Sequence, residues 1–184
     1  MSDMTEHISD LTIERHPLMP FLPSNARLLM LGSFPPPRKR WCMDFFYPNR
    51  SNQMWLIFGE VFFNDSQRLV DEENKTFRLS DIQTLLKERG IAIYDTASAV
   101  RRLSGNASDK DLEIVERTDI AALLSHIPAC HDIVCTGHRP HRGIRCRRPR
   151  HGAIQRVLNI RQAVAFMAHA LLLPRLPHAL GPKG

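Results

Sequence analysis

The stretch that decides the fold is ARLLMLGSFPPPRKRWCMDFFYPNRSNQMW, residues 26–55. It opens with an apolar run, Leu28 to Leu31, which ends at Gly32-Ser33. A Pro-rich turn, an aromatic and basic stretch, and a helix start at Ser51-Asn52 follow. Because open α/β sheets bind ligands at the carboxyl ends of their strands, the loop after the apolar run is the candidate site. It offers backbone amides, aromatic rings, basic side chains and an amide side chain, which are the groups needed to hold a nucleotide.

Short apolar runs alternate with segments of helical period in the rest of the chain up to residue 137. Strands are expected at 26–31, 91–94 and 132–135, and helices from 51, over 79–89, and from Thr118 or Asp119 to about His126. The first helix is expected to be capped by the Ser51 hydroxyl and to bury a face that contains Trp55. Strands that alternate with helices predict a short parallel sheet covered on both faces, which is a three-layer α/β/α fold.

Two smaller features border this pattern. The segment HPLMPFLP, residues 16–23, is too rich in Pro for a helix or a central strand. We therefore expect an ordered lead-in that packs Leu18, Phe21 and Leu22 on the core. Asp95 follows the second expected strand, and its carboxylate could face the site, although a helix or turn cap is the favoured interpretation.

Charge divides the chain into two parts of opposite character. Residues 1–132 carry 15 Lys and Arg against 19 Asp and Glu, whereas residues 133–184 carry 10 Lys and Arg and no acidic residue. The net charge of +6 therefore comes from the tail. We expect one α/β domain over residues 1–137, with a flexible N-terminus over 1–12, followed by an anomalous basic tail over 138–184 that is partly disordered or helical.

The composition argues against secretion, membrane insertion and a metal centre. The four cysteines form no CxxC pair, and the start MSDMTEHISD is acidic and polar, which favours a reducing cytoplasm over export. No apolar run reaches the roughly 18 residues that span a bilayer. The spacing of His126, Cys130, His131 and Cys135 matches no standard zinc site, so we expect neither a metal nor a cofactor.

The tail admits two interpretations. The segment GHRPHRGIRCRRPRHG, residues 137–152, has neither a helical nor a strand period, and such segments are typically disordered arms that bind nucleic acid. The alternative is a shift of the reading frame after about residue 137. A one-base shift of the codons for residues 166–179 can encode Met-Pro-Ser-Ser-Ser-Arg. Shifted Arg codons encode Ala, Asp, Gly or Val, which would explain why Arg is abundant and acids are absent.

The segment GSFPPP…FFYPNRSNQMW resembles the uracil-DNA glycosylase superfamily, and most closely its branch of mismatch-specific and hypoxanthine (deoxyinosine) DNA glycosylases. Gly32-Ser33-Phe34-Pro35 matches the Gly-x-x-Pro loop of that family, and residues 48–55 loosely match its His-Pro-x-Asn-x-Phe-Trp helix start. The resemblance covers roughly residues 14–137. The family's last strand and its Pro-Ser loop, which enters the DNA minor groove, are expected to be missing or replaced here. The shifted frame of the tail would restore that loop.

This resemblance implies a monofunctional DNA glycosylase of base excision repair, acting on uracil or hypoxanthine flipped out of DNA. It also implies a uracil-DNA-glycosylase-like fold, no cofactor, no membrane contact, and a monomeric cytoplasmic enzyme associated with the nucleoid. Asn52 is the implied catalytic residue. The implied base contacts are Gly32, Ser33, Phe34, Pro35, Phe46 and Tyr47, and the implied phosphate contacts are Arg38, Lys39, Arg40 and Arg50.

One departure from the family concerns the attacking water. Many members carry Asp or Asn where Phe34 stands, in order to place that water, so the water-activating group of this chain stays open. The hypoxanthine branch relies on the Asn at the helix start, which favours Asn52, although Asn52 could also serve only to start the helix. Two other functions stay open. They are a nucleic-acid-binding protein without chemistry that uses the tail, and a small α/β hydrolase with Ser33 as nucleophile, despite the missing Gly-x-Ser-x-Gly pattern.

Overall fold

A fully buried strand, β2 (Leu28–Gly32), lies at the centre of the computed structural model. It pairs in parallel with β5 (Ile91–Asp95) on one edge and with β8 (Asp132–Cys135) on the other. The four-stranded sheet has the order β5-β2-β8-β9, in which β9 is Arg156–Asn159. Continuous apolar runs such as Leu28 to Leu31 are typical of parallel strands that are covered on both faces. The three strands expected from the sequence are confirmed.

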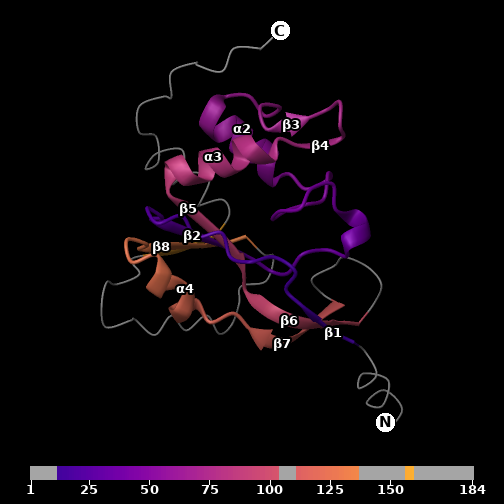
Figure 1. Cartoon of the computed structure of the whole chain (residues 1–184), viewed down its shortest axis with the longest axis vertical. Coiled ribbons are helices and arrows are strands. Elements are labelled where there is room, and N and C mark those ends of the chain that lie inside the picture. Colours follow the sequence, from indigo (N-terminus) through magenta and orange to yellow (C-terminus); the bar gives the residue numbers. More distant parts are fainter. Residues whose placement is uncertain (1–11, 104–110, 137–155, 160–184) are drawn as a thin grey trace.

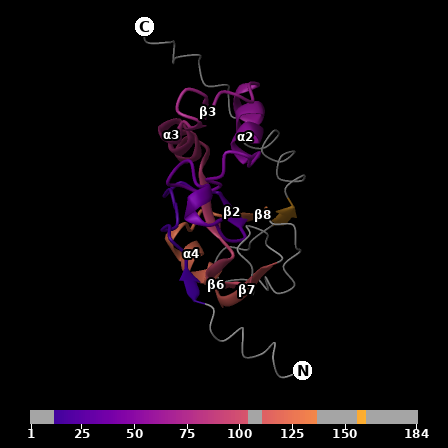
Figure 2. The same ribbon diagram turned by 90° about the vertical axis from the view of Figure 1, so that its right-hand side faces the viewer.

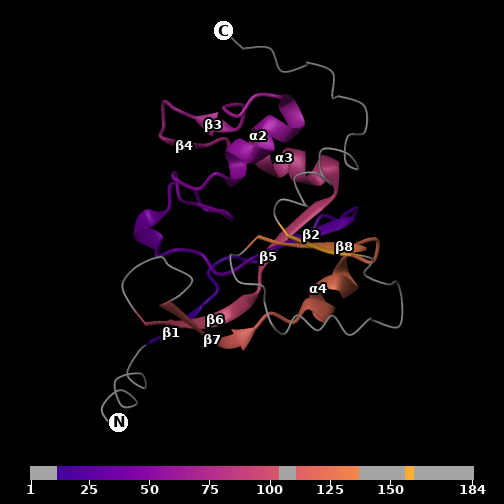
Figure 3. The ribbon, with the colours of Figure 1, turned by 180° about the vertical axis from the view of Figure 1, so that it is seen from behind.

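The structure describes residues 12–103, 111–136 and 156–159, and its elements form three layers (Figure 1). Helices α2 (Met54–Phe63) and α3 (Leu79–Arg89) lie on one side of the parallel sheet, and α4 (Ile120–His126) lies on the other (Figures 1, 2 and 3). The mixed α/β fold with a short central parallel sheet is therefore confirmed. The remaining elements are β1 (Ile13–Arg15), the 3-10 helix η1 (Arg38–Arg40), β3 (Val70–Asp71), β4 (Thr76–Phe77), β6 (Ala97–Arg102) and β7 (Leu112–Arg117).

The main hydrophobic core fills the space between the parallel sheet and the helices. Trp55 and Phe58 of α2 are completely buried, so the apolar face expected for this helix is directed into the core. Helix α3 contributes Leu86, and α4 contributes Leu123, from the opposite side of the sheet. Burying a large apolar side chain stabilises the folded state by roughly 1.5–3 kcal/mol. The core therefore holds the strands, and with them the loops at their ends, in fixed positions.

Two of the three helices, α3 and α4, have the boundaries that the sequence predicts. Helix α3 spans the expected residues and ends at Gly90, which has φ 63°. Helix α4 is capped by Asp119, whose carboxylate accepts a hydrogen bond from the Ala122 amide at 3.0 Å. The expected cap of α2 by Ser51 is wrong. That helix begins at Met54, and Asn52 Oδ1 accepts the hydrogen bond from the Met54 amide at 2.9 Å.

A second sheet, antiparallel and of order β1-β6-β7, was not expected from the sequence. Its strands ASAVRR and LEIVER carry charged residues that pair across the strands, such as Arg101 with Glu113 at 3.3 Å. Cross-strand ion pairs of this kind stabilise a sheet that has one solvated face. The other face buries Ala97 and Val100 against Phe34, which connects this sheet to the loop after β2.

The two outer strands of the three predicted ones, β5 and β8, each pair with a further segment. Phe21, in the lead-in segment, exchanges two backbone hydrogen bonds with Ile93 of β5, at 3.0 and 2.9 Å. Leu18, Phe21 and Leu22 pack against the core, as expected. On the other edge β9 pairs in parallel with β8, so the tail supplies a fourth strand. Of the two expected alternatives, a last strand that is missing or one that is replaced, the pairing of β9 with β8 supports replacement.

Several expectations concern residues outside the described ones. The flexible N-terminus and the tail at 137–155 and 160–184 fall into this class, as does the division of the chain near residue 137 into a domain and a tail. The frame-shift interpretation likewise stays a prediction. No described helix combines the length and the apolar composition needed to cross a membrane.

Candidate active site at the carboxyl end of the parallel sheet

The carboxyl ends of three parallel strands meet at one edge of the molecule's central sheet. Gly32 of β2 lies in register with Asp95 of β5. The Thr96 amide donates to the Gly32 carbonyl at 2.9 Å, and the Thr136 amide, just after β8, donates to the Leu31 carbonyl at 3.0 Å. These bonds hold the residues that follow β5 and β8 in fixed positions beside the end of β2, where a ligand could bind.

The loop that leaves β2 is held to the body by side-chain hydrogen bonds. The Trp41 indole donates to the Pro36 carbonyl at 2.7 Å, which closes the turn around η1. The Thr76 hydroxyl donates to the Cys42 carbonyl at 2.6 Å, and the Trp55 indole donates to the Phe46 carbonyl at 3.2 Å. A loop tied at these places can hold site residues in a fixed geometry, which is what a preorganised site requires.

Tyr47 brings this loop back to the ends of the strands. Its hydroxyl lies 2.9 Å from Thr136 Oγ1, and its backbone adopts the left-handed conformation with φ 50°. Burial raises the pKa of Tyr47 well above its ordinary value of 10.0, and the nearby Asp95 carboxylate raises it further. The phenol therefore stays protonated and neutral at physiological pH. An uncommon left-handed backbone at a non-glycine residue often marks a functional constraint.

The site also contains a buried histidine–carboxylate pair. His16 Nε2 lies 2.9 Å from Asp95 Oδ2, and their side chains are 2% and 9% exposed. His16 Nδ1 lies 2.9 Å from the Leu18 carbonyl and 3.1 Å from the Leu18 amide, so each ring nitrogen has a partner, Nδ1 in the lead-in segment and Nε2 in β5. The favoured expectation that Asp95 caps a helix or turn is wrong, because its side chain binds His16. Asp95 and His16 are the site residues that the sequence did not assign.

Gly32 provides the space that this pair needs. A Cβ atom added to Gly32 would meet Asp95 Oδ1 at 2.2 Å and the Tyr47 hydroxyl at 3.6 Å. The Asp95 carboxylate therefore lies directly against the end of β2, with the Tyr47 phenol beside it. Any side chain at this position would displace the carboxylate, since real Cβ atoms do not approach other atoms this closely.

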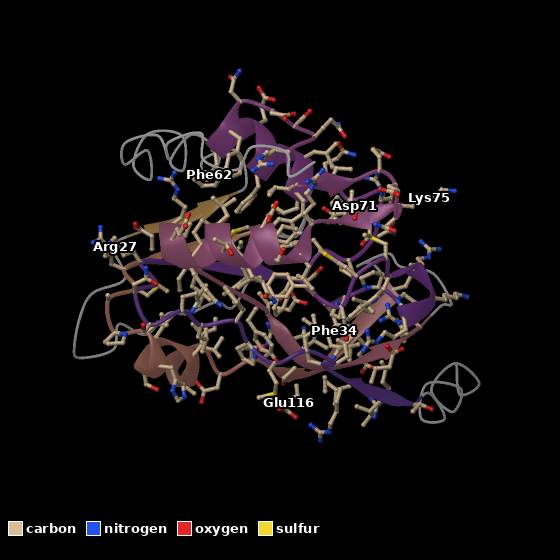
Figure 4. The ribbon with its side chains drawn as sticks, turned by 45° about the horizontal axis from the view of Figure 1, so that its top comes forward. Arg27, Phe34, Phe62, Asp71, Lys75 and Glu116 are labelled. Carbon is tan, nitrogen blue, oxygen red and sulfur yellow. The ribbon has the colours of Figure 1, made fainter. Side chains whose placement is uncertain are left out.

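Two of the expected base contacts have side chains that serve packing. Phe34 is 7% exposed and joins Ala97 and Val100 in the second hydrophobic cluster, under the Arg102 guanidinium at 5.9 Å from its ring. Figure 4 shows Phe34 inside the molecule beside the antiparallel sheet, whereas Glu116 projects from the outer side of that sheet. Phe46 is 3% exposed and belongs to the main core. Among the expected stacking rings, Tyr47 is the one at the ends of the strands.

The other two residues of the Gly-x-x-Pro loop contribute backbone contacts. The Ser33 carbonyl accepts a hydrogen bond from the Thr96 hydroxyl at 3.5 Å, and the Pro35 carbonyl accepts one from Arg102 at 3.0 Å. Arg102 also donates twice to the Glu14 carboxylate, each time at 2.9 Å. The loop is therefore bonded to Thr96 and to Arg102 of β6, and Arg102 is in turn held by Glu14 of β1.

Asn52 is exposed at the start of α2. Its Oδ1 is occupied by the bond to the Met54 amide, which is the helix-start role considered from the sequence. Among the described residues no group accepts a hydrogen bond from Asn52 Nδ2. The side chain is thus oriented through its oxygen, and its amide donor is open to a molecule that approaches from solvent.

The four basic residues expected to contact phosphates differ in their surroundings. Arg50 forms an ion pair with Glu72 at 2.7 Å, and its guanidinium lies over Phe77 at 5.5 Å from the ring, so it has a structural role. Arg38 pairs with Asp44 and stacks on Trp41. Lys39 and Arg40 are exposed, and no described carboxylate pairs with either. These last two are the cations of the loop that remain available to a phosphate.

Within the described residues, no group of three or more His, Cys, Asp or Glu side chains is arranged to hold a metal ion.

No protein-family model and no curated protein matches the chain. It is similar to a solution NMR structure of a "putative Uracil DNA glycosylase" from Methanosarcina acetivorans, with 24% sequence identity and a TM-score of 0.48 over 69% of this chain and 71% of that one. At this level of similarity the function has to be argued from the residues of the chain itself.

Proposed function

We propose that this protein is a monofunctional DNA glycosylase that hydrolyses the N-glycosidic bond of a deaminated base, uracil or hypoxanthine, flipped out of DNA. The observation that carries the proposal is the meeting of the Gly32–Pro35 loop, Tyr47 and the buried Asp95 at the carboxyl ends of three parallel strands. This edge is where open α/β sheets place their ligands. The resemblance of residues 32–55 to the glycosylase superfamily concerns the same loop.

Residues at this edge and in the loop that follows β2 can each perform one step of base excision. A base must leave the duplex before its glycosidic bond can be reached, and it is then held by stacking and by hydrogen bonds to its edge. The Tyr47 ring and the backbone of the Gly32–Pro35 loop form the wall of this pocket in our proposal. Asn52 Nδ2 donates to the base or to the attacking water. Lys39 and Arg40 contact phosphates, which gives an affinity that is independent of sequence and falls with salt.

The first test is excision from duplexes that contain uracil or hypoxanthine, measured as abasic product in single turnovers. We expect product with the wild-type chain and a loss of at least tenfold with Asn52→Ala. The matched variant Asn52→Asp keeps an oxygen that can accept the Met54 amide but removes the amide donor. It should therefore lose activity as well, while its helix start stays intact. Wild-type activity in Asn52→Asp would show that Asn52 only caps the helix.

The two other functions predict different results in the same assay. A nucleic-acid-binding protein without chemistry would bind both duplexes and yield no abasic product. A hydrolase with Ser33 as nucleophile would need a histidine to take up the serine proton. Both ring nitrogens of His16 are already bonded, one to Asp95 and the other to Leu18, so the structure offers Ser33 no base from that residue.

A further inference from the structure

The buried His16–Asp95 pair has no role in the function described so far. Burying a carboxyl group beside an imidazole removes both from water at a cost in free energy, and apolar residues of the same size would often be at least as stable. A titratable pair retained in such a place is a candidate for function, particularly when it lies in a site. The pair lies at the carboxyl end of β5, in register with Gly32 at the end of β2.

The geometry determines which oxygen of the carboxylate is occupied. A carboxylate can only accept hydrogen bonds, so His16 Nε2–H donates to Asp95 Oδ2 across the 2.9 Å between them. The imidazole is held by Leu18 at its other nitrogen and lies against Tyr94 and Phe34, with ring centroids at 4.6 and 5.3 Å. His16 therefore has little freedom to turn, and it fixes the plane of the carboxylate.

The second oxygen, Asp95 Oδ1, faces the candidate site. It lies within 2.2 Å of the point where a Gly32 Cβ would stand, and the Tyr47 hydroxyl lies within 3.6 Å of the same point. Phe34 cannot accept a proton, and its ring is buried in the second cluster. The carboxylate beside the first residue of the Gly-x-x-Pro loop can therefore supply the proton acceptor that this loop lacks.

We propose that Asp95 is the catalytic residue that orients the attacking water and takes its proton through Oδ1, and that His16 is the positioning residue that fixes the carboxylate. This inference rests on the proposed glycosylase function. In the step, the water oxygen forms a bond to C1′ of the sugar while the C1′–N bond breaks and its electron pair leaves with the base. One water proton passes to Asp95 and later to solvent, and the base anion takes a proton from solvent.

The test is Asp95→Asn in the full chain, with excision rate and affinity for lesion-containing DNA measured separately. Asn keeps an oxygen for the His16 donor but is a poor proton acceptor, so we expect the single-turnover rate to fall roughly 10²- to 10⁴-fold with affinity unchanged. The matched control is Asp132→Asn. Asp132 is a completely buried carboxylate that also pairs with a histidine, His131 at 3.0 Å, but at the amino end of β8. This control should excise at the wild-type rate.

His16 is tested with His16→Phe and His16→Gln. Phe fills the aromatic surroundings but leaves Asp95 without its donor, whereas the Gln amide can donate to the carboxylate. We expect the rate of His16→Phe to fall at least tenfold and that of His16→Gln to recover part of the loss, with DNA affinity unchanged in both. Equal rates for the two variants at equal thermal stability would exclude a positioning role for His16.

The outcomes separate the two proposals. If the wild-type chain excises the base and Asp95→Asn does so within about threefold of its rate, the role of Asp95 in catalysis is wrong and the glycosylase function stands. If Asp95→Asn loses affinity for the lesion rather than rate, the carboxylate binds the edge of the base and the water-activating role is overturned. If the wild-type chain yields no abasic product, the glycosylase function fails and the role of Asp95 fails with it.

Discussion

At the scale of single residues, the site depends on contacts between segments that are far apart in the chain. Gly32, Tyr47 and Asp95 come from β2, the following loop and β5, and they meet within a few ångströms. The sequence predicted Gly32 and Tyr47 because they lie in one motif-bearing loop. It did not predict His16, because a histidine in a Pro-rich segment has many possible partners and Asp95 is 79 positions away. Only the packing of the lead-in segment against β5 brings the two together.

The expected stacking role of Phe46 and the substrate contact of Phe34 show the same limit. An aromatic residue in a loop can stack on a ligand or anchor the loop, and the sequence pattern is identical for both. Here the antiparallel sheet, which the sequence did not predict, provides the apolar surface that buries Phe34. The ring of Phe46 is buried in the main core near Tyr94, at 6.2 Å between centroids.

The buried phenol of Tyr47 should make the free energy of unfolding fall at alkaline pH. Because burial raises its pKa in the folded state above the ordinary 10.0, the unfolded chain loses this proton at a lower pH than the folded chain does. The free energy of unfolding should therefore fall as pH rises above about 10, by up to about 1.4 kcal/mol per pH unit from this group. Tyr47→Phe removes that contribution, so its unfolding free energy should fall less steeply.

The measurement is urea unfolding of both chains at pH 8, 9, 10 and 11. Burial also raises the pKa of Cys130 from 9.0 to about 11, so Cys130→Ala is a useful comparison. It should flatten the curve from about pH 9, one unit below the effect of Tyr47→Phe. At pH 8 Tyr47→Phe should be destabilised by about 1 kcal/mol, since it lacks the hydrogen bond to Thr136. Parallel curves for wild type and Tyr47→Phe above pH 10 would contradict the buried, protonated phenol.

At the scale of elements, the sequence was most informative where an element is buried on both sides. The strands β2, β5 and β8 are continuous apolar runs, so both their existence and their parallel arrangement followed from pattern. The strands β6 and β7 are half exposed and carry Arg and Glu that pair across the sheet, so their pattern is weak. Elements stabilised by contacts between strands distant in sequence cannot be identified from one strand alone.

The start of α2 illustrates the same limit over a few residues. Ser51 and Asn52 are both good capping residues, and the sequence alone does not distinguish them. In the structure Ser51 donates its hydroxyl to Asn49 Oδ1 at 2.9 Å, and the Met54 amide binds Asn52. We expect Asn52→Ala to lower the free energy of unfolding by about 1 kcal/mol, and Ser51→Ala to change it by less than about 0.5 kcal/mol.

Thermal or urea unfolding of the two variants at pH 7 measures this difference, and Asn52→Asp should match wild type because it keeps an acceptor oxygen. If Ser51→Ala proves the more destabilising change, the hydrogen bond from the Met54 amide to Asn52 is not what stabilises the start of α2. The result also bears on catalysis. A stable Asn52→Asp variant without excision activity would show that the side-chain oxygen stabilises the helix start and that the amide donor is needed for excision.

At the scale of the whole molecule, the parallel sheet is bordered by segments from the two ends of the described chain. The lead-in segment bonds to β5 through Phe21 and Ile93, and β9 pairs with β8. Unpaired strand edges bind other chains and cause aggregation, so these two segments should protect the edges of β5 and β8. The basic tail thus supplies a strand to the fold and is also the source of the net positive charge of the chain, because it contains no acidic residue.

The contribution of β9 can be measured by truncation. A chain that ends at residue 136 loses β9 and exposes the edge of β8, whereas a chain that ends at residue 159 keeps β9 and is the matched control. We expect the shorter chain to elute as larger species in size-exclusion chromatography and to melt at a lower temperature than the control. Each backbone hydrogen bond of the β8–β9 pair contributes only about 0.5–1.5 kcal/mol net, so the loss of solubility should exceed the loss of stability. A monomeric 1–136 chain that melts with the control would show that β9 does not protect this edge, and that the sheet needs only its three predicted strands.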